Sequence, residues 1–205
     1  MTITPSAPGV AERRHAFVGH LYGLCAALTA EQYRAGPARQ QLAKLRRSFA
    51  GPRQEADAYA VVFPFDPPLR EQQVWLLVAG LFAIHPHANT ARGRTIGGAM
   101  RIVAVARGQS AERRLTQLLS VDQQALPHYL RQAVQLLRSE DVAFDVHKLL
   151  ADLVVLLGDE NDDAAHRIRL RWARDFHRPD RQSRWSGGFD RSTVDSPSSE
   201  MQENL

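Results

Sequence analysis

Apolar residues recur at steps of three and four positions from about Glu12 to Arg178, and this spacing restricts the possible folds more than any other feature. In an α-helix such spacing puts apolar side chains on one face, whereas a half-buried strand alternates with a period of two. We find no convincing alternating stretch and no internal repeat. The run AYAVVFPF, residues 58–65, is rich in β-branched and aromatic residues, so a departure from helix is most expected there. The sequence predicts an all-α protein.

The same spacing predicts which side chains face the core. The strongest apolar segment, Leu69–Ile84, predicts a helix deep in the protein. Within residues 53–63 the spacing selects an inward face of Ala56, Tyr59, Ala60 and Phe63. The other predicted core residues are Phe17, Leu21, Leu24, Leu28, Leu42, Leu45, Phe49, Met100, Val103, Ala104, Leu115, Leu118, Leu119, Leu126, Leu130, Val134, Leu137, Val146, Leu149, Leu150, Leu153, Val154, Leu157, Ile168, Trp172 and Phe176.

Capping and helix-breaking residues predict where the helices begin and end. Thr29 is expected to cap a helix that begins near Ala30, and Pro37 is expected close to a helix start. Ser110 is expected to cap a later helix in the same way. The stretch HPHANTARGRTIGG, residues 85–98, is polar and separates two apolar helices. We expect this stretch to form a long, mobile loop.

The double glycine in GRTIGGAM, residues 93–100, stands among arginines and raises the question of a nucleotide site. A P-loop needs a Gly-Lys-Ser/Thr sequence that puts lysine on the phosphates and a hydroxyl on magnesium, and this sequence is missing. A dinucleotide fingerprint needs a preceding strand, and none is predicted. We interpret the glycines as a flexible lead-in and a close approach at a helix start, where free amides can still contact a phosphate.

The composition limits the class of protein. Cys25 is the only cysteine, which excludes an internal disulfide and a cysteine-built zinc site and fits a reducing compartment. No apolar run reaches the roughly 18–20 residues that span a bilayer, and no signal peptide is recognised. We therefore expect a cytoplasmic protein with no membrane partner. Polar residues predict a flexible start at 1–11 and a disordered tail at 179–205.

Charge is segregated along the chain, although the net charge is only +4. Six basic residues and no acid lie between Gln32 and Gln54, and a second basic segment runs from Ala91 to Arg114. Residues 139–163 are mainly acidic. Arginine-rich composition can follow from the codon usage of a GC-rich genome, but segregation of the two signs is harder to explain in that way. The pattern predicts a surface that faces a polyanion.

No group of residues predicts catalysis. The histidines of His85-Pro-His87 lack further ligands for a metal, and Cys25 lies on an apolar helix face, where core packing is expected. We interpret the acids at 140–163 as a solvated or partner-contacting patch, and we expect no cofactor, no metal and no enzyme. Two alternatives stay open. One is an all-α, metal-dependent nuclease that uses the acids at 159–163, and the other is a helical regulator that reads DNA sequence.

Several motifs occur in a recognisable order. They are the helix LAKLRRSF (42–49), the segment GQSAERRLTQLL (108–119), the helix LPHYLRQAVQLL (126–137), KLLADL (148–153) and WARDF (172–176). Together they resemble CasB, the small subunit of the type I-E CRISPR surveillance complex, Cascade. The resemblance covers roughly residues 12–178, and its most specific part is the second motif together with the three that follow it. The tail and the 85–94 loop depart from shorter relatives.

The resemblance implies two small helical bundles, which we place at residues 12–108 and 109–178. It also implies a non-catalytic subunit that contacts other Cascade subunits and a second copy of itself. Such a subunit binds guide RNA and target DNA, including the displaced strand, through phosphates rather than base edges. The residues that match the family's nucleic-acid surface are Lys44, Arg46, Arg47, Arg101, Arg107, Arg113 and Arg114, with Arg131 as a further candidate.

Overall fold

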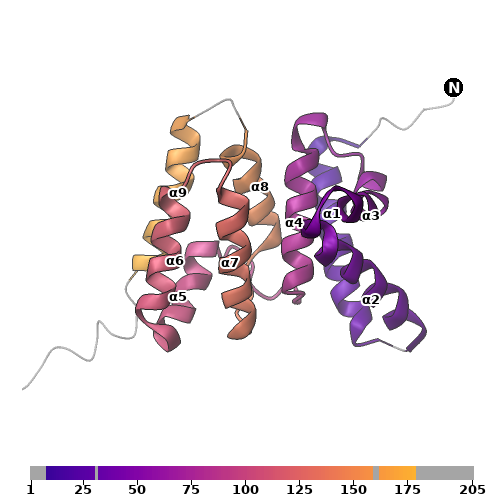
Figure 1. Cartoon of the computed structure of the whole chain (residues 1–205), viewed down its shortest axis with the longest axis horizontal. Helices are drawn as coiled ribbons and strands as arrows, with labels where there is room; N and C mark the ends of the chain where they lie inside the picture. Colours follow the sequence, from indigo (N-terminus) through magenta and orange to yellow (C-terminus); the bar gives the residue numbers. More distant parts are fainter. Residues whose placement is uncertain (1–7, 31, 159–161, 179–205) are drawn as a thin grey trace, which may run out of the picture.

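A computed structural model describes residues 8–30, 32–158 and 162–178, and every regular element in these ranges is a helix (Figure 1). The α-helices are α1 (Val10–Leu28), α2 (Gln32–Arg47), α3 (Pro52–Val62), α4 (Gln72–Ile84), α5 (Ile96–Arg107), α6 (Gln109–Ser120), α7 (Leu126–Ser139), α8 (Val146–Leu156) and α9 (Asp162–His177). Three single turns of 3-10 helix are η1 (Ser48–Ala50), η2 (Phe63–Phe65) and η3 (Leu69–Glu71). The predicted all-α fold is confirmed, and it holds through residues 58–65.

The two predicted flexible ends fall largely outside the described ranges. Residues 1–7 and 179–205 are not described, so the prediction of a disordered tail stays a prediction. At the other end, α1 already begins at Val10, inside the stretch expected to be flexible. Gly9 precedes it, and its backbone N–H donates to the Glu12 carboxylate at 2.9 Å, which satisfies one of the free amides at the helix start.

Helix α4 lies at the centre of the molecule (Figure 1), with α1–α3 on one side and α7 and α8 on the other. Every residue from Val74 to Ile84 is buried. A helix that is apolar on all sides needs neighbours on all sides, and α4 contacts α2, α3, α7 and α8. The strongest apolar segment of the sequence therefore forms the shared wall between the N-terminal and C-terminal helices.

The predicted core is largely confirmed. Buried apolar side chains form one hydrophobic cluster that extends from Phe17 in α1 to Phe176 in α9. Seven predicted core residues are only half-buried against this cluster, namely Leu28, Phe49, Tyr59, Ala104, Leu119, Val154 and Leu157. The division into bundles at residues 12–108 and 109–178 stays a prediction. Helix α5, which ends just before that boundary, packs against α9 and α6.

The predicted inward face of α3 is wrong at three of its four residues, whereas Tyr59 is half-buried against the hydrophobic cluster. Ala56 and Ala60 are exposed, and Phe63 is 39% exposed. The residues that face the core are Ala58, Val61 and Val62. Apolar residues occur on two sides of this short helix, so spacing alone cannot choose between them, and the branched valines fill the space beside α2 and α4. The Tyr59 and Phe63 rings instead stack on each other, with their centroids 4.9 Å apart.

Three predicted helix boundaries are also wrong. Thr29 is the C-cap of α1 rather than the N-cap of the next helix, and its hydroxyl donates to the Ala26 carbonyl oxygen at 3.0 Å. Pro37 lies inside α2. The sequence predicts one helix start near Ala30 and another near Pro37, but α2 is a single helix that continues through the proline. Ser110 lies within the first turn of α6, after Gly108, which has a positive φ of 52° and turns the chain between α5 and α6. A polar residue before an apolar run is therefore not a sufficient sign of a cap.

The 85–98 stretch is anchored rather than loose. His85 and His87 are buried, and His85 Nε2 donates to the Val142 carbonyl oxygen at 3.1 Å. The Gly93 N–H donates to the Asp145 carboxylate at 2.6 Å, and the Asp145 N–H donates to the Arg94 carbonyl oxygen at 2.9 Å. Asp145 also caps α8 through the Lys148 N–H. Backbone groups that are paired in this way hold the stretch against the start of α8, so the expectation of a mobile loop is wrong.

Candidate nucleic-acid interface

Helix α7 has one buried side and one polar side. Leu130, Val134 and Leu137 face the core. At about 100° per residue, Arg131, Gln135 and Arg138 lie together on one flank of this buried side, each about 100° from the core residue before it, and all three are exposed. We call this flank the α7 face and define it by Arg131, Gln132, Gln135, Arg138 and Ser139. It carries two positive charges and two amides and no acid.

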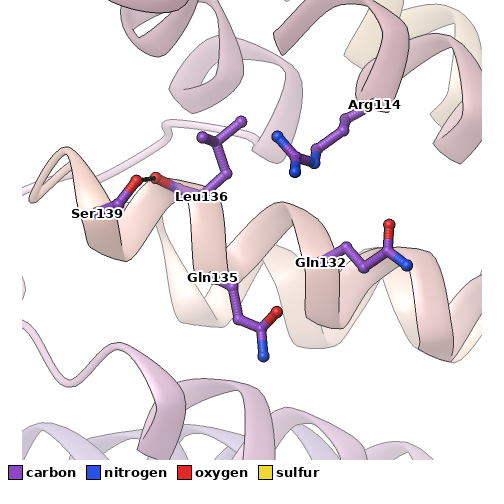
Figure 2. A pocket seen from close by; sticks show the side chains of 5 residues that line it. All are labelled: Arg114, Gln132, Gln135, Leu136 and Ser139. Atoms are coloured by element: carbon purple, nitrogen blue, oxygen red, sulfur yellow. Dashed lines mark hydrogen bonds between the residues drawn. The ribbon is translucent and has the colours of Figure 1, made fainter. Parts of the chain in front are cut away.

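Arg114 of α6 borders the α7 face across a groove (Figure 2). The groove has a volume of about 520 Å³ and is lined by Arg114, Gln132, Gln135, Leu136 and Ser139. The Arg114 side chain points into the groove, and its Nη1 donates to the Ser110 hydroxyl at 3.1 Å. The lining thus combines one guanidinium with two amides and holds no carboxylate, and such N–H donors suit the oxygens of a phosphate.

Arg107 reaches the far end of α7. Its Nε donates to Glu140 Oε1 at 2.6 Å, and Glu140 is the residue that directly follows α7. The Arg107 side chain is 54% exposed and that of Glu140 is 20% exposed, so the pair lies at the surface. One of the predicted phosphate ligands therefore already holds a carboxylate.

Arg131 connects the α7 face to the end of α2. Its guanidinium carbon lies 5.0 Å from the centroid of the Phe49 ring, a cation–π contact. Phe49 belongs to η1, two residues after Arg47, and both Arg46 and Arg47 are exposed. Lys44, one turn earlier, is half-buried. This contact brings the basic end of α2 beside α7, although about 80 residues separate them in the sequence.

Two predicted site residues stand apart from the α7 face. Arg101 is half-buried and follows Gly97 by one helical turn, on the side of α5 that packs against α9. Arg113 is exposed, and its Nη2 donates to Gln109 Oε1 at 3.4 Å. It lies about 100° around α6 from Arg114, on the outer side of that helix. The structure thus groups Arg107, Arg114, Arg131 and the Arg46–Arg47 end of α2 around one helix.

Four members of the α7 face, namely Gln132, Gln135, Arg138 and Ser139, were not predicted as site residues from the sequence. A signal was nevertheless available, because Arg131, Gln135 and Arg138 follow one another at steps of four and three, on one flank of the predicted core residues of the same helix. That spacing identifies an exposed polar stripe, while the groove beside it depends on where α6 packs.

The acidic residues do not assemble a catalytic centre in the described ranges. No three His, Cys, Asp or Glu side chains there are placed to hold a metal ion. Asp162 and Asp163 are exposed in the first turn of α9, and residues 159–161 lie outside the description. Asp152, in contrast, is buried and accepts hydrogen bonds from Trp172 Nε1, at 2.7 Å, and from Arg171. Its role is to join α8 to α9.

Two further expectations can be compared with the structure. Cys25 is half-buried against the hydrophobic cluster, and burial raises the pKa of its thiol, which keeps the thiol protonated. This agrees with a packing role. Across residues 8–30, 32–158 and 162–178, no helix combines the length and the apolar character that crossing a membrane requires.

Comparison with known proteins identifies close structural relatives. The model of the family "CRISPR-associated protein Cse2" matches residues 41–177. CasB from Thermus thermophilus is 28% identical over 81% of this chain and 96% of its own, with a TM-score of 0.59. M. ruber CasB is 29% identical over 81% of this chain and 93% of its own, with a TM-score of 0.60. No curated protein matched.

A third match shows the fold alone. It is a chain from a structure described as a CRISPR RNA-guided surveillance complex, 22% identical to this chain, with a TM-score of 0.64. The match covers 83% of this chain and 94% of the other. These solved structures therefore share the helical arrangement over almost their whole length. The rest of this chain has no counterpart in the matches.

Proposed function

The chain belongs to the Cse2 family of CRISPR-associated proteins, and from this membership we propose that it is the non-catalytic small subunit of a type I-E Cascade complex. In this role it acts in the cytoplasm and contacts other Cascade subunits and a second copy of itself. It stabilises the pairing of guide RNA with target DNA and holds the displaced DNA strand. The antiviral complex then keeps its target open while other components act.

In this proposal, nucleic acid binds along the α7 face, and the protein does not recognise the base sequence. Arg114, Arg131 and the Arg46–Arg47 pair supply guanidinium groups that contact phosphates, and Gln132 and Gln135 add amide donors. Phosphate contacts release counterions and are independent of sequence, so binding should weaken steeply as salt rises. Arg107 joins the surface when Glu140 releases it. Lys44, Arg101 and Arg113 are secondary contacts in this proposal.

One observation carries the proposal. Arg131 lies over Phe49 while Arg114 points into the groove beside the α7 face, so α6, α7 and the end of α2, which are distant in the sequence, contribute to a single basic strip. No acid is among the residues of the α7 face. The family membership supplies the biological setting for this surface.

A charge-reversal experiment tests the proposal. The double variant Arg46→Glu with Arg47→Glu, and separately Arg114→Glu with Arg131→Glu, should weaken binding of the purified chain to single- and double-stranded DNA by about tenfold or more. Each lost phosphate contact should also reduce the slope of log K against log salt by about 0.7–0.9. Binding is measured by fluorescence anisotropy at several salt concentrations.

The matched control is Arg167→Glu with Arg174→Glu. Both residues are exposed on α9, away from the α7 face, and the change in net charge is the same. The control should keep the wild-type salt slope. Equal losses in the control and in the α7-face variants would show that only net charge matters, and the assignment of the surface would be wrong. A strong preference for one DNA sequence would favour the alternative of a sequence-reading regulator.

A further inference from the structure

A second pocket lies beside the basic strip, and the proposed function does not use it. It has a volume of about 390 Å³ and lies between η1, α3 and α4 on one side and the connection from α6 to α7 on the other. Phe49, Leu77 and Pro127 contribute apolar walls, and Gln73, Gln123 and Gln124 contribute amides. Its volume falls in the range of pockets that hold small ligands, which is about 300–1,000 Å³. We call it the Phe49 pocket.

Phe49 is held firmly in the wall of this pocket. The edge of its ring fits against Gly80 of α4, where a Cβ would come within 2.7 Å of two ring carbons. Arg131 of α7 lies over the ring, with its guanidinium carbon 5.0 Å from the ring centroid, and is not among the residues that line the pocket. An aromatic ring that is fixed before the ligand arrives loses little conformational freedom on binding.

The charges at the pocket separate two kinds of group. One acid, Glu55, and one arginine, Arg70, line it, so its interior is close to neutral. The positive charge of Arg131 lies against Phe49 outside the pocket, and the exposed Arg46 and Arg47 precede Phe49 by three and two residues in the sequence. A phosphate is therefore favoured outside the pocket, near Arg131, and a neutral, flat group with hydrogen-bonding edges is favoured inside. Amide side chains match such edges, since each carries two N–H donors and a carbonyl acceptor, although Gln123 already donates one N–H to the Gly158 carbonyl oxygen at 3.2 Å.

We propose that the Phe49 pocket takes an unstacked base of a single nucleic-acid strand while Arg46, Arg47 and Arg131 hold the adjacent phosphates. This inference rests on the proposed function and goes beyond it, because it gives the protein a base-binding site in addition to phosphate contacts. The amides can pair with the edge of any base, so the site favours single strands over duplex without selecting a sequence. Duplex bases are paired and stacked and do not enter.

The test compares strands with and without bases. The full-length chain is titrated with an oligothymidylate, an oligouridylate of equal length, and an abasic oligodeoxynucleotide of the same length. A base that inserts beside an aromatic ring should give both base-bearing strands an affinity about tenfold above that of the abasic strand. Gln73→Trp and Gln124→Trp fill the pocket from its two walls and should remove this preference without lowering the affinity for the abasic strand.

Leu170→Trp is the control, because it places the same indole at an exposed position of α9. It should retain the full preference for base-bearing strands. If all strands bind with equal affinity to the wild type, or if both pocket variants keep the preference, the Phe49 pocket does not bind a base, whereas the proposed function stands. If no strand binds at all, the proposed function fails and the inference fails with it. A preference limited to oligouridylate would restrict the ligand to RNA.

Discussion

Gly97 of α5 lies directly against the backbone of Trp172 in α9. A Cβ at residue 97 would be 1.9 Å from the Trp172 carbonyl oxygen, which is far inside any normal contact. The glycine is part of the double glycine that first suggested a nucleotide-binding loop, and the alternative interpretation, a close approach at a helix start, is confirmed. Thr95 fixes the same junction, because its side-chain oxygen accepts from the Gly98 N–H and its hydroxyl donates to the Asp175 carboxylate.

The first prediction is that Gly97→Ala destabilises the protein. The added methyl group must push α5 away from α9, and overpacking of this kind costs about 1–3 kcal/mol. Gly98→Ala is the matched control, since a Cβ there would meet its nearest atom, Arg94 Cγ, at 3.5 Å, an ordinary contact. The control should be neutral or slightly stabilising, because alanine favours a helix over glycine by up to about 1 kcal/mol. Urea unfolding followed by circular dichroism measures both, and equal stabilities would contradict the close approach.

The second prediction concerns the stability below neutral pH. Burial, more than any other cause, lowers the pKa of His87 to about 4, and burial also lowers that of His85. Between about pH 6.5 and pH 4 the unfolded chain therefore binds a proton at His87 while the folded chain does not. The contribution of the neutral His87 ring to the free energy of unfolding is complete above about pH 6.5 and is lost as the pH falls.

The free energy of unfolding should accordingly fall by up to about 1.4 kcal/mol per pH unit for each such histidine across this window. The His87 ring packs against Phe144, with ring centroids 4.8 Å apart, so phenylalanine is a reasonable replacement. His87→Phe should have a visibly shallower dependence of stability on pH than the wild type. Asp141, Arg94 and His85 also act on His87, and they are unchanged in this variant. Parallel pH profiles for the two proteins would rule out the buried, neutral state of His87.

Local spacing predicted most of the fold because helices such as α2 and α7 have one clear apolar face. Leu42 and Leu45, or Leu130 and Val134, have no competing apolar side, and they are buried as expected. Helix α3 has apolar residues on two sides, and only the position of its neighbours selects Val61 and Val62. The 85–98 stretch shows a second limit of local reasoning. Its polar residues predict a loose loop, whereas in the structure it is held by hydrogen bonds to distant residues such as Val142 and Asp145.

The candidate interface was predictable only in part, for the same reason. Charge segregation predicted two basic segments and the family resemblance selected the arginines, but sequence does not show that Arg131 meets Phe49 or that Arg107 meets Glu140. Both contacts join helices whose relative positions depend on the packing of α4, α6 and α7. Consequently the sequence could name basic residues without separating those on one surface from those, such as Arg101, that lie elsewhere.

The third prediction concerns the carboxylate that holds Arg107. If Glu140 competes with phosphate for Arg107, Glu140→Gln should strengthen binding to single-stranded DNA by up to about fivefold, because an exposed ion pair contributes up to about 1 kcal/mol. The slope of log K against log salt should become steeper by up to about 0.7, the equivalent of one more phosphate contact. Fluorescence anisotropy over a range of salt concentrations measures both quantities.

Two further variants separate competition at Arg107 from a general effect of charge. Asp57→Asn changes the net charge by the same amount on an exposed position of α3 and should alter the affinity less. Arg107→Gln combined with Glu140→Gln should bind no better than Arg107→Gln alone, because the carboxylate then has no guanidinium to withhold. The effect of Glu140→Gln on the binding free energy should thus be larger in the presence of Arg107 than in its absence, which is a coupling between the two residues. If Glu140→Gln strengthens binding equally with and without Arg107, the Glu140 carboxylate repels nucleic acid directly. In that case the Glu140 carboxylate does not compete with phosphate for Arg107.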